Sequence, residues 1–423
     1  MYNILSLFSA AIAKLAGNRA TVMPKKRQVK SKDTHKEPNF RLLDNERLED
    51  WLKKHTPDCY PRCYPEKGEM TYPDRYSNIK RALLPIHDEV EIGAMSAGAT
   101  KWMKELIEVI KTIENPSERD RKLKQLSDSD PIVYLNNHGH AHVDKVIERI
   151  SEILPFFENG HLDPYEGFLL LCAIQIHDIG IVFGRDGHER RCREILEKEC
   201  KPFIKDNLER RVIEELALVH GGAFNGDPNT IGCLVPQRAL NNKNIRNRLL
   251  AALLRFGDEL ADDSSRANRV GLEHGTIQEG SLIYHHYSQS LHTVRLDREN
   301  ITGKIQLELY YEFDTNIATM KFKKNGIEKY LLDEIYDRTL KMERERRYCM
   351  RFLTPCFSLD KIKVEIIIQS ANQKDPFKND KIQYTLEECG YPIYPGTGRI
   401  KDFSADLRNG EEEMKHIKKE WGL

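Results

Sequence analysis

The segment that most constrains the fold runs from Asp163 to Asp178, where an almost wholly apolar helix ends in a His-Asp pair. Asp163-Pro164 predicts the start of this helix, with an N-cap aspartate and a proline at the first helical position. From Phe168 to Ile176 almost every residue is apolar, so the helix must be covered on nearly all sides. Burying the pair His177-Asp178 at its end is costly unless the pair is compensated. The segment therefore predicts a helical bundle with a polar site inside it.

Four further segments repeat apolar residues at helical spacing around this central helix. One follows His142, one begins at His188, one ends at His220 and one contains Asp258. Because helices of this kind bury their apolar stripes against one another, residues 138–268 are predicted to form an all-helical domain.

The apolar period changes from helical to strand-like after about residue 270. Strands are expected at 283–286, 303–313, 318–323 and 361–369, and a long charged helix at 331–350. The expected fold class is mainly α, a helical bundle followed by a smaller α+β C-terminal region. The expected parts are a flexible N-terminal segment 1–40, a mostly helical region 41–137 with a helix at 96–113, the helical domain 138–268, a strand-rich extension 269–370 and a polar tail 371–423.

Composition excludes several classes of function. Lys and Arg number 66 and so do Asp and Glu, so no overall field draws the 423-residue chain to nucleic acid or to an anionic membrane. The nine cysteines follow no repeating frame, which favours reduced thiols and a cytoplasmic location. The apolar stretch within residues 1–17 is too short to span a bilayer, and the basic run 25–36 is typical of a solvated linker. No glycine-rich phosphate loop of the Walker type is present, which argues against an ATP-driven motor.

Several histidines and aspartates lie on the predicted helices beside core positions. Taken singly, each is more often a surface or capping residue than a ligand. His177, Asp178 and Asp258 are harder to explain in this way, because apolar neighbours share their helix faces. A divalent cation compensates such groups, and imidazole and carboxylate ligands suit Mn, Fe, Co, Ni or Zn, with Mg as a further candidate.

The motifs, in their order along the chain, resemble the HD superfamily of metal-dependent phosphohydrolases. They are His142-Val-Asp-Lys-Val, His177-Asp178-Ile-Gly180, Gly187-His188-Glu189, Val219-His220 and Phe256-Gly-Asp258-Glu-Leu260. The resemblance covers about a third of the chain. Asn137-His138-Gly139 and the segment from Phe256 to Arg266 look most like HD-type domains of bacterial conflict and defence operons, and the chain is also similar to deoxynucleoside triphosphate triphosphohydrolases.

The resemblance implies a role for each motif residue. The ligands of a first metal would be His142, His177, Asp178 and Asp258. His188 and His220 would bind a second metal or transfer protons, and Asp178 would bridge two ions. The implied chemistry is in-line attack on phosphorus by hydroxide made available by the cation, with a histidine protonating the leaving oxygen.

Phosphate also needs cations that the metal does not supply. The candidate substrate contacts are His138, Arg185, Arg255 and Arg266. The alternative for Arg255 and Arg266 is an ordinary ion pair with Glu259, Asp262 or Asp263. The dipeptide His87-Asp88 is interpreted as a loop or a cap, because no buried helix precedes it. Tyr284-His285-His286-Tyr287 is interpreted as a strand edge, with the alternative that it lines a nucleotide pocket.

The first functional hypothesis is hydrolysis of a nucleoside or deoxynucleoside triphosphate, in the setting of antiviral defence. The alternatives are a single-stranded nuclease, a cyclic-nucleotide phosphodiesterase, and a module that senses a nucleotide without catalysis. A small substrate is favoured because no basic and aromatic stripe runs through the helical domain. The expected partners are a nucleotide substrate, a regulatory nucleotide and a further copy of the chain, rather than a membrane or nucleic acid.

Overall fold

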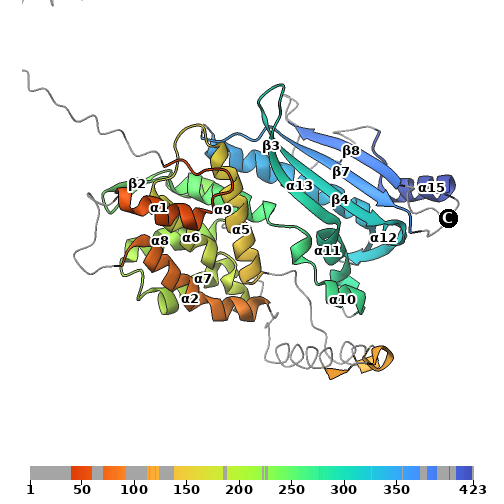
Figure 1. Ribbon diagram of the computed structural model, residues 1–423, viewed down its shortest axis with the longest axis horizontal. Helices are drawn as coiled ribbons and strands as arrows, with labels where there is room; N and C mark the ends of the chain where they lie inside the picture. The colour runs from red at the N-terminus through yellow and green to blue at the C-terminus, as the bar shows by residue number, and fades with distance from the viewer. Residues whose placement is uncertain are drawn as a thin grey trace, which may run out of the picture. The chain divides into compact units, whose positions relative to one another are not determined.

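The computed structural model describes residues 40–59, 70–91, 112–113, 115–119, 121–122, 138–183, 188–221, 223, 227–275, 277, 279–324, 326–354, 356–371, 379–387, 400 and 406–421. They lie in one unit, Phe40–Leu423 (Figure 1). The segment 1–39, Arg185 and nearly all of the helix expected at 96–113 lie outside the described residues.

Helix α6, Pro164–Ile176, is the centre of the helical bundle, and every one of its residues is buried. Asp163 caps it as predicted: its side chain accepts from the Tyr165 backbone N–H, and Glu166 completes a reciprocal capping box. Five helices pack on α6: α1 (Leu48–Cys59), α2 (Tyr72–Glu91), α5 (His140–Ile153), α8 (Asn207–Leu218) and α9 (Asn247–Leu260). An apolar helix is stable here because its neighbours remove all its faces from water.

The stretch Pro164–Phe183 is apolar and long enough to cross a membrane by composition alone. Its most apolar window is 89% buried inside the protein. This burial is that of a core helix, because the faces that lipid would cover are occupied by other helices.

Short elements join the bundle helices. They are the 3-10 turns Leu154–Phe156, Ile179–Phe183 and Ile231–Cys233, α7 (His188–Ile195), the π turn Leu196–Cys200, and strands β1 (Arg238–Leu240) and β2 (Lys243–Ile245). The β1–β2 hairpin turns at Asn241 and Asn242, whose φ angles are 47° and 60°. Asparagine tolerates this left-handed backbone, which a two-residue hairpin of this type requires.

The C-terminal region forms an α+β layer beside the bundle (Figure 1). Its elements are the 3-10 turn Ser264–Arg266, α10 (Arg269–Glu273), α11 (Glu279–Ser290), β3 (Leu291–Arg298), β4 (Ile305–Asp314), α12 (Thr315–Thr319), β5 (Lys321–Lys324), β6 (Ile327–Tyr330), α13 (Leu331–Leu353), β7 (Lys361–Gln369), β8 (Asn379–Glu387) and α15 (Gly410–Trp421). One sheet has the order β3-β4-β7-β8, with β4 and β7 parallel and the outer pairs antiparallel. Helix α13 crosses from β4 towards β7 and packs on α9. The expected fold class, mainly α with a smaller α+β part, is confirmed.

Of two strands expected in the C-terminal region, the one at 283–286 was wrong and the one at 318–323 was right only for its second half. Residues 283–286 lie in helix α11 rather than in a strand, and residues 318–323 contain the end of α12 and the start of β5. In α11, Ser281, Ile283, His285 and Tyr287 alternate with less buried residues, because β5, α13 and the turn at Ser264–Arg266 pack on several of its sides. Because α11 is covered on several sides, the order of its apolar and polar residues does not follow the 3.6-residue period of a helix with one buried face, and it was misread as that of a strand.

The interpretation of His87-Asp88 as a loop or a cap was also wrong, because both residues lie in α2. The His87 side chain is buried, with 2% of its surface exposed. The segment expected as a polar tail contains β8 and α15.

Candidate metal centre

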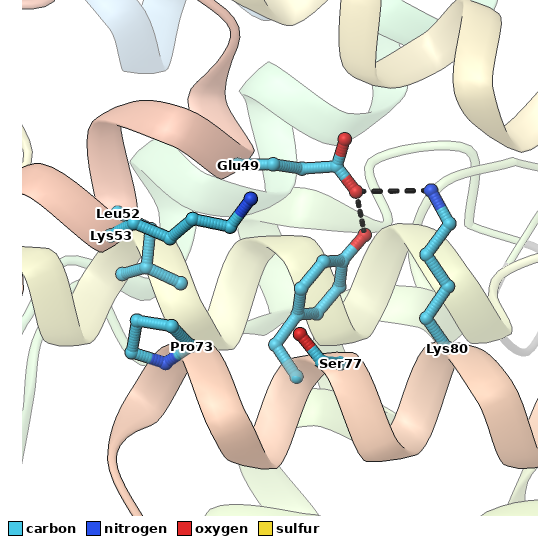
Figure 2. Close-up of a pocket in the computed structure, with 7 residues that line it drawn as sticks. Glu49, Leu52, Lys53, Pro73, Ser77 and Lys80 are labelled. Carbon is cyan, nitrogen blue, oxygen red and sulfur yellow. Dashed lines mark hydrogen bonds and ion pairs between the residues drawn. The ribbon is translucent and has the colours of Figure 1, made fainter.

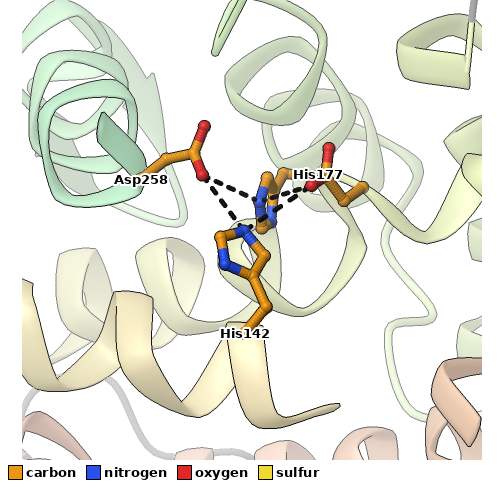
Figure 3. Close-up of side chains that lie close together, drawn as sticks. His142, His177 and Asp258 are labelled. Carbon is orange, nitrogen blue, oxygen red and sulfur yellow. Dashed lines mark ion pairs between the residues drawn. The ribbon is translucent and has the colours of Figure 1, made fainter. Parts of the chain in front are cut away.

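The six residues that the resemblance implies as metal ligands or proton donors lie close together, although they come from the ends of five helices. His142 lies in the first turn of α5, His177 caps the C-terminus of α6, and Asp178 follows it. His188 begins α7, His220 follows α8, and Asp258 lies in the last turn of α9. Figure 3 shows His142, His177 and Asp258 pointing toward one another from three segments.

Two glycines allow these segments to approach closely. A Cβ atom on Gly257 would clash with the Ile150 side chain, so glycine lets α9 lie against α5 and brings Asp258 to His142. A Cβ atom on Gly180 would clash with the His188 carbonyl oxygen, so glycine lets α7 meet the turn after Asp178. Glycine at both positions is therefore part of how the site is assembled.

The first ligand group consists of His142, His177, Asp178 and Asp258, and one donor atom from each lies within 4.8 Å of the others. His142 Nε2 is 3.1 Å from Asp258 Oδ1 and 3.6 Å from Asp178 Oδ2. His177 Nε2 is 3.5 Å from Asp178 Oδ2 and 3.8 Å from Asp258 Oδ1. Both imidazoles are fully buried, and they face the nearly buried Asp178 carboxylate and the partly exposed Asp258 carboxylate.

The second ligand group shares Asp178 with the first. Its Oδ1 atom is 3.1 Å from His188 Nε2 and 3.4 Å from His220 Nε2, and the three donor atoms lie within 4.8 Å of one another. Asp178 thus presents Oδ2 to one pair of histidines and Oδ1 to another. A carboxylate in this position can bridge two cations.

The histidine hydrogen bonds direct nitrogen lone pairs into the centre. His177 Nδ1 lies 2.8 Å from the Ile174 carbonyl oxygen, and His220 Nδ1 lies 2.5 Å from that of Ala217. Because a carbonyl only accepts, Nδ1 carries the hydrogen in each ring. In a neutral ring, Nε2 is then an acceptor that faces carboxylate oxygens. Within the described residues, His177 Nε2 and both His142 nitrogens have no hydrogen-bond partner. Such an arrangement is repulsive without a cation or a proton at its centre, so the residues fit a metal ion.

The pKa values of the carboxylates and of His177 are also shifted in the directions expected where buried negative charge needs a positive neighbour. Burial alone would raise the pKa of Asp178, but His177, His138 and His188 hold it well below its ordinary range. The pKa of Asp258 is likewise depressed against the effect of burial, here by His142 and His177. Burial lowers the pKa of His177, but the two carboxylates raise it to about 9. In the metal-free protein, a proton on His177 therefore supplies the charge that a cation would replace.

Two of the four candidate phosphate contacts lie at the edge of this centre. His138 Nδ1 is 2.8 Å from Asp178 Oδ2, and Arg266 Nη2 is 3.1 Å from His138 Nε2. Burial and the Arg266 charge both lower the pKa of His138. Arg266 therefore brings positive charge next to the first ligand group, although its Nη1 also lies 3.8 Å from Asp262 Oδ1, an ion pair that was the alternative considered for this residue.

Arg255 lies elsewhere, and Arg185 is outside the described residues. The Arg255 guanidinium makes two hydrogen bonds to Glu345, of 2.6 and 2.7 Å, and one to Thr230. It also stacks over the Tyr348 ring. An ion pair was the alternative considered for this residue, although Glu345 was not among the partners considered.

Sequence reasoning missed a cation that α13 brings to the centre. Lys341 Nζ lies 2.6 Å from Glu259 Oε2, directly after Asp258, and its side chain is 53% exposed. Burial lowers the pKa of Lys341, but Glu259 and Asp258 raise it overall. Lys341 and Glu259 are 82 positions apart in the sequence, so no local sequence pattern predicts that they form an ion pair.

A separate cavity of about 300 Å³ lies between α1 and α2, and Figure 2 shows Glu49 and Lys80 pointing toward each other across it. Lys80 Nζ is 3.1 Å from Glu49 Oε1 and 3.0 Å from Asp144 Oδ1 on α5. Tyr76 donates to Glu49 and accepts from Gln175, two residues before His177. These bonds hold α1 and α2 against the two helices that carry His142 and His177.

His285 and His286 lie outside both ligand groups. His285 is fully buried and its Nδ1 accepts from the Asn268 backbone N–H, while His286 packs against Phe322. Both therefore have places in the packing of α11.

A family model described as HD-CE matches residues 123–341, just over half of the chain. The match includes all six residues of the two ligand groups. None of the curated proteins compared with the sequence matches it.

Proposed function

Because the chain belongs to the HD-CE family, we propose that it hydrolyses nucleotides with the help of divalent metal ions, with deoxynucleoside and nucleoside triphosphates as the first candidates. An HD-type domain with a buried His/Asp cluster indicates a metal-dependent phosphohydrolase in general. The observation that carries the proposal is the position of Asp178 between two groups of histidines.

In this proposal the first ion is held by His142, His177, Asp178 and Asp258, and a second by Asp178, His188 and His220. Bound divalent cations lower the pKa of water and offset charge on phosphoryl oxygens. The carbonyls of Ile174 and Ala217 accept from Nδ1 of His177 and His220 and fix the orientation of both rings, so these two ligands are in place before an ion arrives.

The remaining polar residues bind phosphate and move protons. Arg266 binds phosphate oxygens beside the first group, with His138 held between it and Asp178. His188 exchanges protons with solvent more readily than His220, since 19% of its side chain is exposed against 6%. Its Nδ1 lies 3.3 Å from Glu189 Oε2, which gives the proton an acceptor at the surface. If no second ion is bound, His188 Nε2 is instead available to protonate the leaving oxygen, a step that contributes about 10²–10⁴-fold to a rate.

A small substrate is favoured over nucleic acid. Arg266 lies beside His138, and Lys341 lies beside Glu259, the residue after Asp258, so two cations are available near the centre for the phosphates of one nucleotide. The chain as a whole has no excess of basic residues to follow a polynucleotide backbone. A role in antiviral defence belongs to this proposal as its biological setting and rests on the resemblance of the motifs alone.

The test is hydrolysis by chelator-treated protein to which Mn²⁺ has been returned. The panel contains deoxynucleoside triphosphates, nucleoside triphosphates, cyclic dinucleotides and labelled single-stranded DNA, with products read by mass. Release of phosphate or triphosphate from mononucleotides is expected, and Asp178→Asn should abolish it. Asp50→Asn, at a side chain that is 65% exposed on α1, is the matched control.

Other outcomes identify the alternatives. Cleavage of DNA that falls steeply with salt, with mononucleotides intact, would replace the proposal by a nuclease. Opening of cyclic dinucleotides alone would replace it by a phosphodiesterase. Nucleotide binding without turnover, at every metal tried and with mixed nucleotide pools, would leave a sensing module.

A further inference from the structure

The C-terminal elements bring together a second set of metal-ligating side chains. Glu413 and His416 are three residues apart on α15 and therefore share one face of that helix. Asp380 lies at the start of β8, the outer strand of the sheet. One donor atom from each of the three lies within 4.8 Å of the others.

This cluster is short of positive charge. The Glu413 carboxyl is 4% exposed and lies in hydrogen-bonding contact with the Asp380 carboxyl. Burial, and then Asp380, raise the pKa of Glu413 to about 7. The nearest cation among the described residues is Arg408, whose Nη1 is 3.5 Å from Glu413 Oε1 and whose side chain is 46% exposed. Two adjoining carboxyl groups require a shared proton or a cation between them.

A buried hydroxyl beside the cluster also lacks a partner. Tyr336 of α13 is 3% exposed, and within the described residues its Oη atom makes no hydrogen bond. Burial raises the pKa of Tyr336 most, and the nearby Glu413 carboxylate follows as the next cause. A buried hydroxyl without a hydrogen-bond partner is destabilising, so this phenol indicates a missing polar neighbour at the cluster.

We propose that Asp380, Glu413 and His416 bind a divalent transition-metal ion that fastens α15 to β8. One imidazole and two carboxylates suit Zn²⁺, Co²⁺, Ni²⁺ or Mn²⁺, and a water in the remaining position gives the Tyr336 hydroxyl its partner. Ligands about 2.1 Å from a four-coordinate ion lie about 3.4 Å from one another, so shifts of about an ångström in the side chains close the site.

This site is independent of the centre in the helical bundle. It uses other elements and shares no ligand with His142, His177, Asp178 or Asp258. Its role is structural, because α15 otherwise contacts the protein through α13 and β6. Removal of the ion should therefore loosen α15 and leave the bundle intact.

The experiment measures metal content in the full-length protein with the bundle centre disabled. Chelator-treated Asp178→Ala protein is titrated with Co²⁺, and bound metal is followed by elemental analysis and by the absorption of the Co²⁺ complex. The same measurement is made after adding His416→Ala, Asp380→Asn or, as the matched control, His292→Ala at an exposed histidine of β3. The expected result is a loss of one equivalent of metal per chain with His416→Ala and with Asp380→Asn, and none with His292→Ala.

Glu413→Gln separates the metal from a shared proton. If the ion is present, this change removes one equivalent and lowers the Tm measured with Co²⁺. Unchanged Co²⁺ content in the His416→Ala and Asp380→Asn proteins would overturn the proposal. A Glu413→Gln protein with the Tm of the wild type in Co²⁺ would also overturn the proposal. In that case Asp380 and Glu413 of the wild-type protein share a proton instead of a metal ion.

Discussion

Asp178 shows how a single residue depends on its neighbours in space. Its two oxygens face different histidine pairs, and its buried charge is tolerated only because His177, His138 and His188 surround it. The residues that complete the centre differ in exposure: His142 and His177 are fully enclosed, whereas 27% of the Asp258 side chain is exposed. Asp258 is thus the first-group ligand that can be altered with least disturbance of the core.

We expect Asp258→Ala to leave the helices folded and to lower the content of transition metal or added Mn²⁺ well below one equivalent in the first group. The physical reason is the loss of one of two carboxylates, which leaves the imidazoles a weaker site for a divalent cation. Elemental analysis and circular dichroism check the two parts. Full occupancy in this variant would exclude Asp258 as a ligand, and Asp50→Ala controls for loss of an exposed aspartate.

We expect His188→Ala and His220→Ala to keep the first metal and to lose turnover by about 10²–10⁴-fold. The first group retains its four donors in both variants, while the second group loses one of three. Metal analysis with single-turnover rates makes the comparison. Near-normal rates would assign the altered histidine to packing, and loss of all metal would make it a ligand of the first ion.

His87, which belongs to neither ligand group, gives a pH-dependent prediction. Burial, and then the nearby His177, lower its pKa to about 4 from an ordinary value near 6.5. Below pH 6.5 the unfolded chain binds a proton that the folded chain resists until about pH 4, so stability falls over this range as pH decreases. The loss approaches about 3 kcal/mol, from 1.36 kcal/mol per pKa unit.

His87→Leu should abolish this part of the acid sensitivity. Its cost at pH 7.5 should be about 1 kcal/mol, because the change removes the side-chain interaction of His87 with Gln175. Urea unfolding of both proteins at pH 7.5, 6.5 and 5 measures the difference in stability between them. A difference that stays constant with pH would contradict the prediction.

At the scale of elements, α9 and α13 are joined by charged pairs along their length. Arg255 binds Glu345, Lys341 binds Glu259, and Arg338 lies 3.3 Å from Asp262, just beyond the end of α9. The C-terminal region is thereby attached to the helix that carries Asp258. The position of the metal centre thus depends on an element outside the bundle.

Arg338→Met should destabilise the protein by about 3 kcal/mol. Arg338 forms ion pairs with Asp262 and with the fully buried Glu334. Its guanidinium also lies over the Tyr284 and Tyr287 rings. Without Arg338, the buried Asp262 loses its closer cation and retains Arg266 at 3.8 Å, whereas Glu334 keeps Lys324 and Lys329. Arg295→Met is the control, since Arg295 is 62% exposed in a surface pair with Glu308 and should cost less than about 1 kcal/mol. Equal effects in denaturant unfolding would show that the α9–α13 network contributes no more than a surface pair.

At the scale of the whole molecule, the sequence determined the features that depend on near neighbours. The capped start of α6 at Asp163 and the long helix α13 followed from local signals, as did strand β7 at Lys361–Gln369. The residues of both ligand groups were proposed from the order of the motifs and their resemblance to the HD superfamily. Burial alone singled out His177-Asp178 and Asp258, because a polar group on a buried helix has few tolerable environments.

Tertiary structure alone decided what depends on distant neighbours. Elements distant in the sequence pack on several sides of α11, which is a helix. The pairing of Arg255 with Glu345, and of Lys341 with Glu259, likewise depends on how α13 lies against α9. It also divided the oxygens of Asp178 between two histidine pairs and brought Asp380 to Glu413 and His416. The physical reason is that periodicity records which faces are buried, whereas the partner of a charged side chain is set by where separate elements meet.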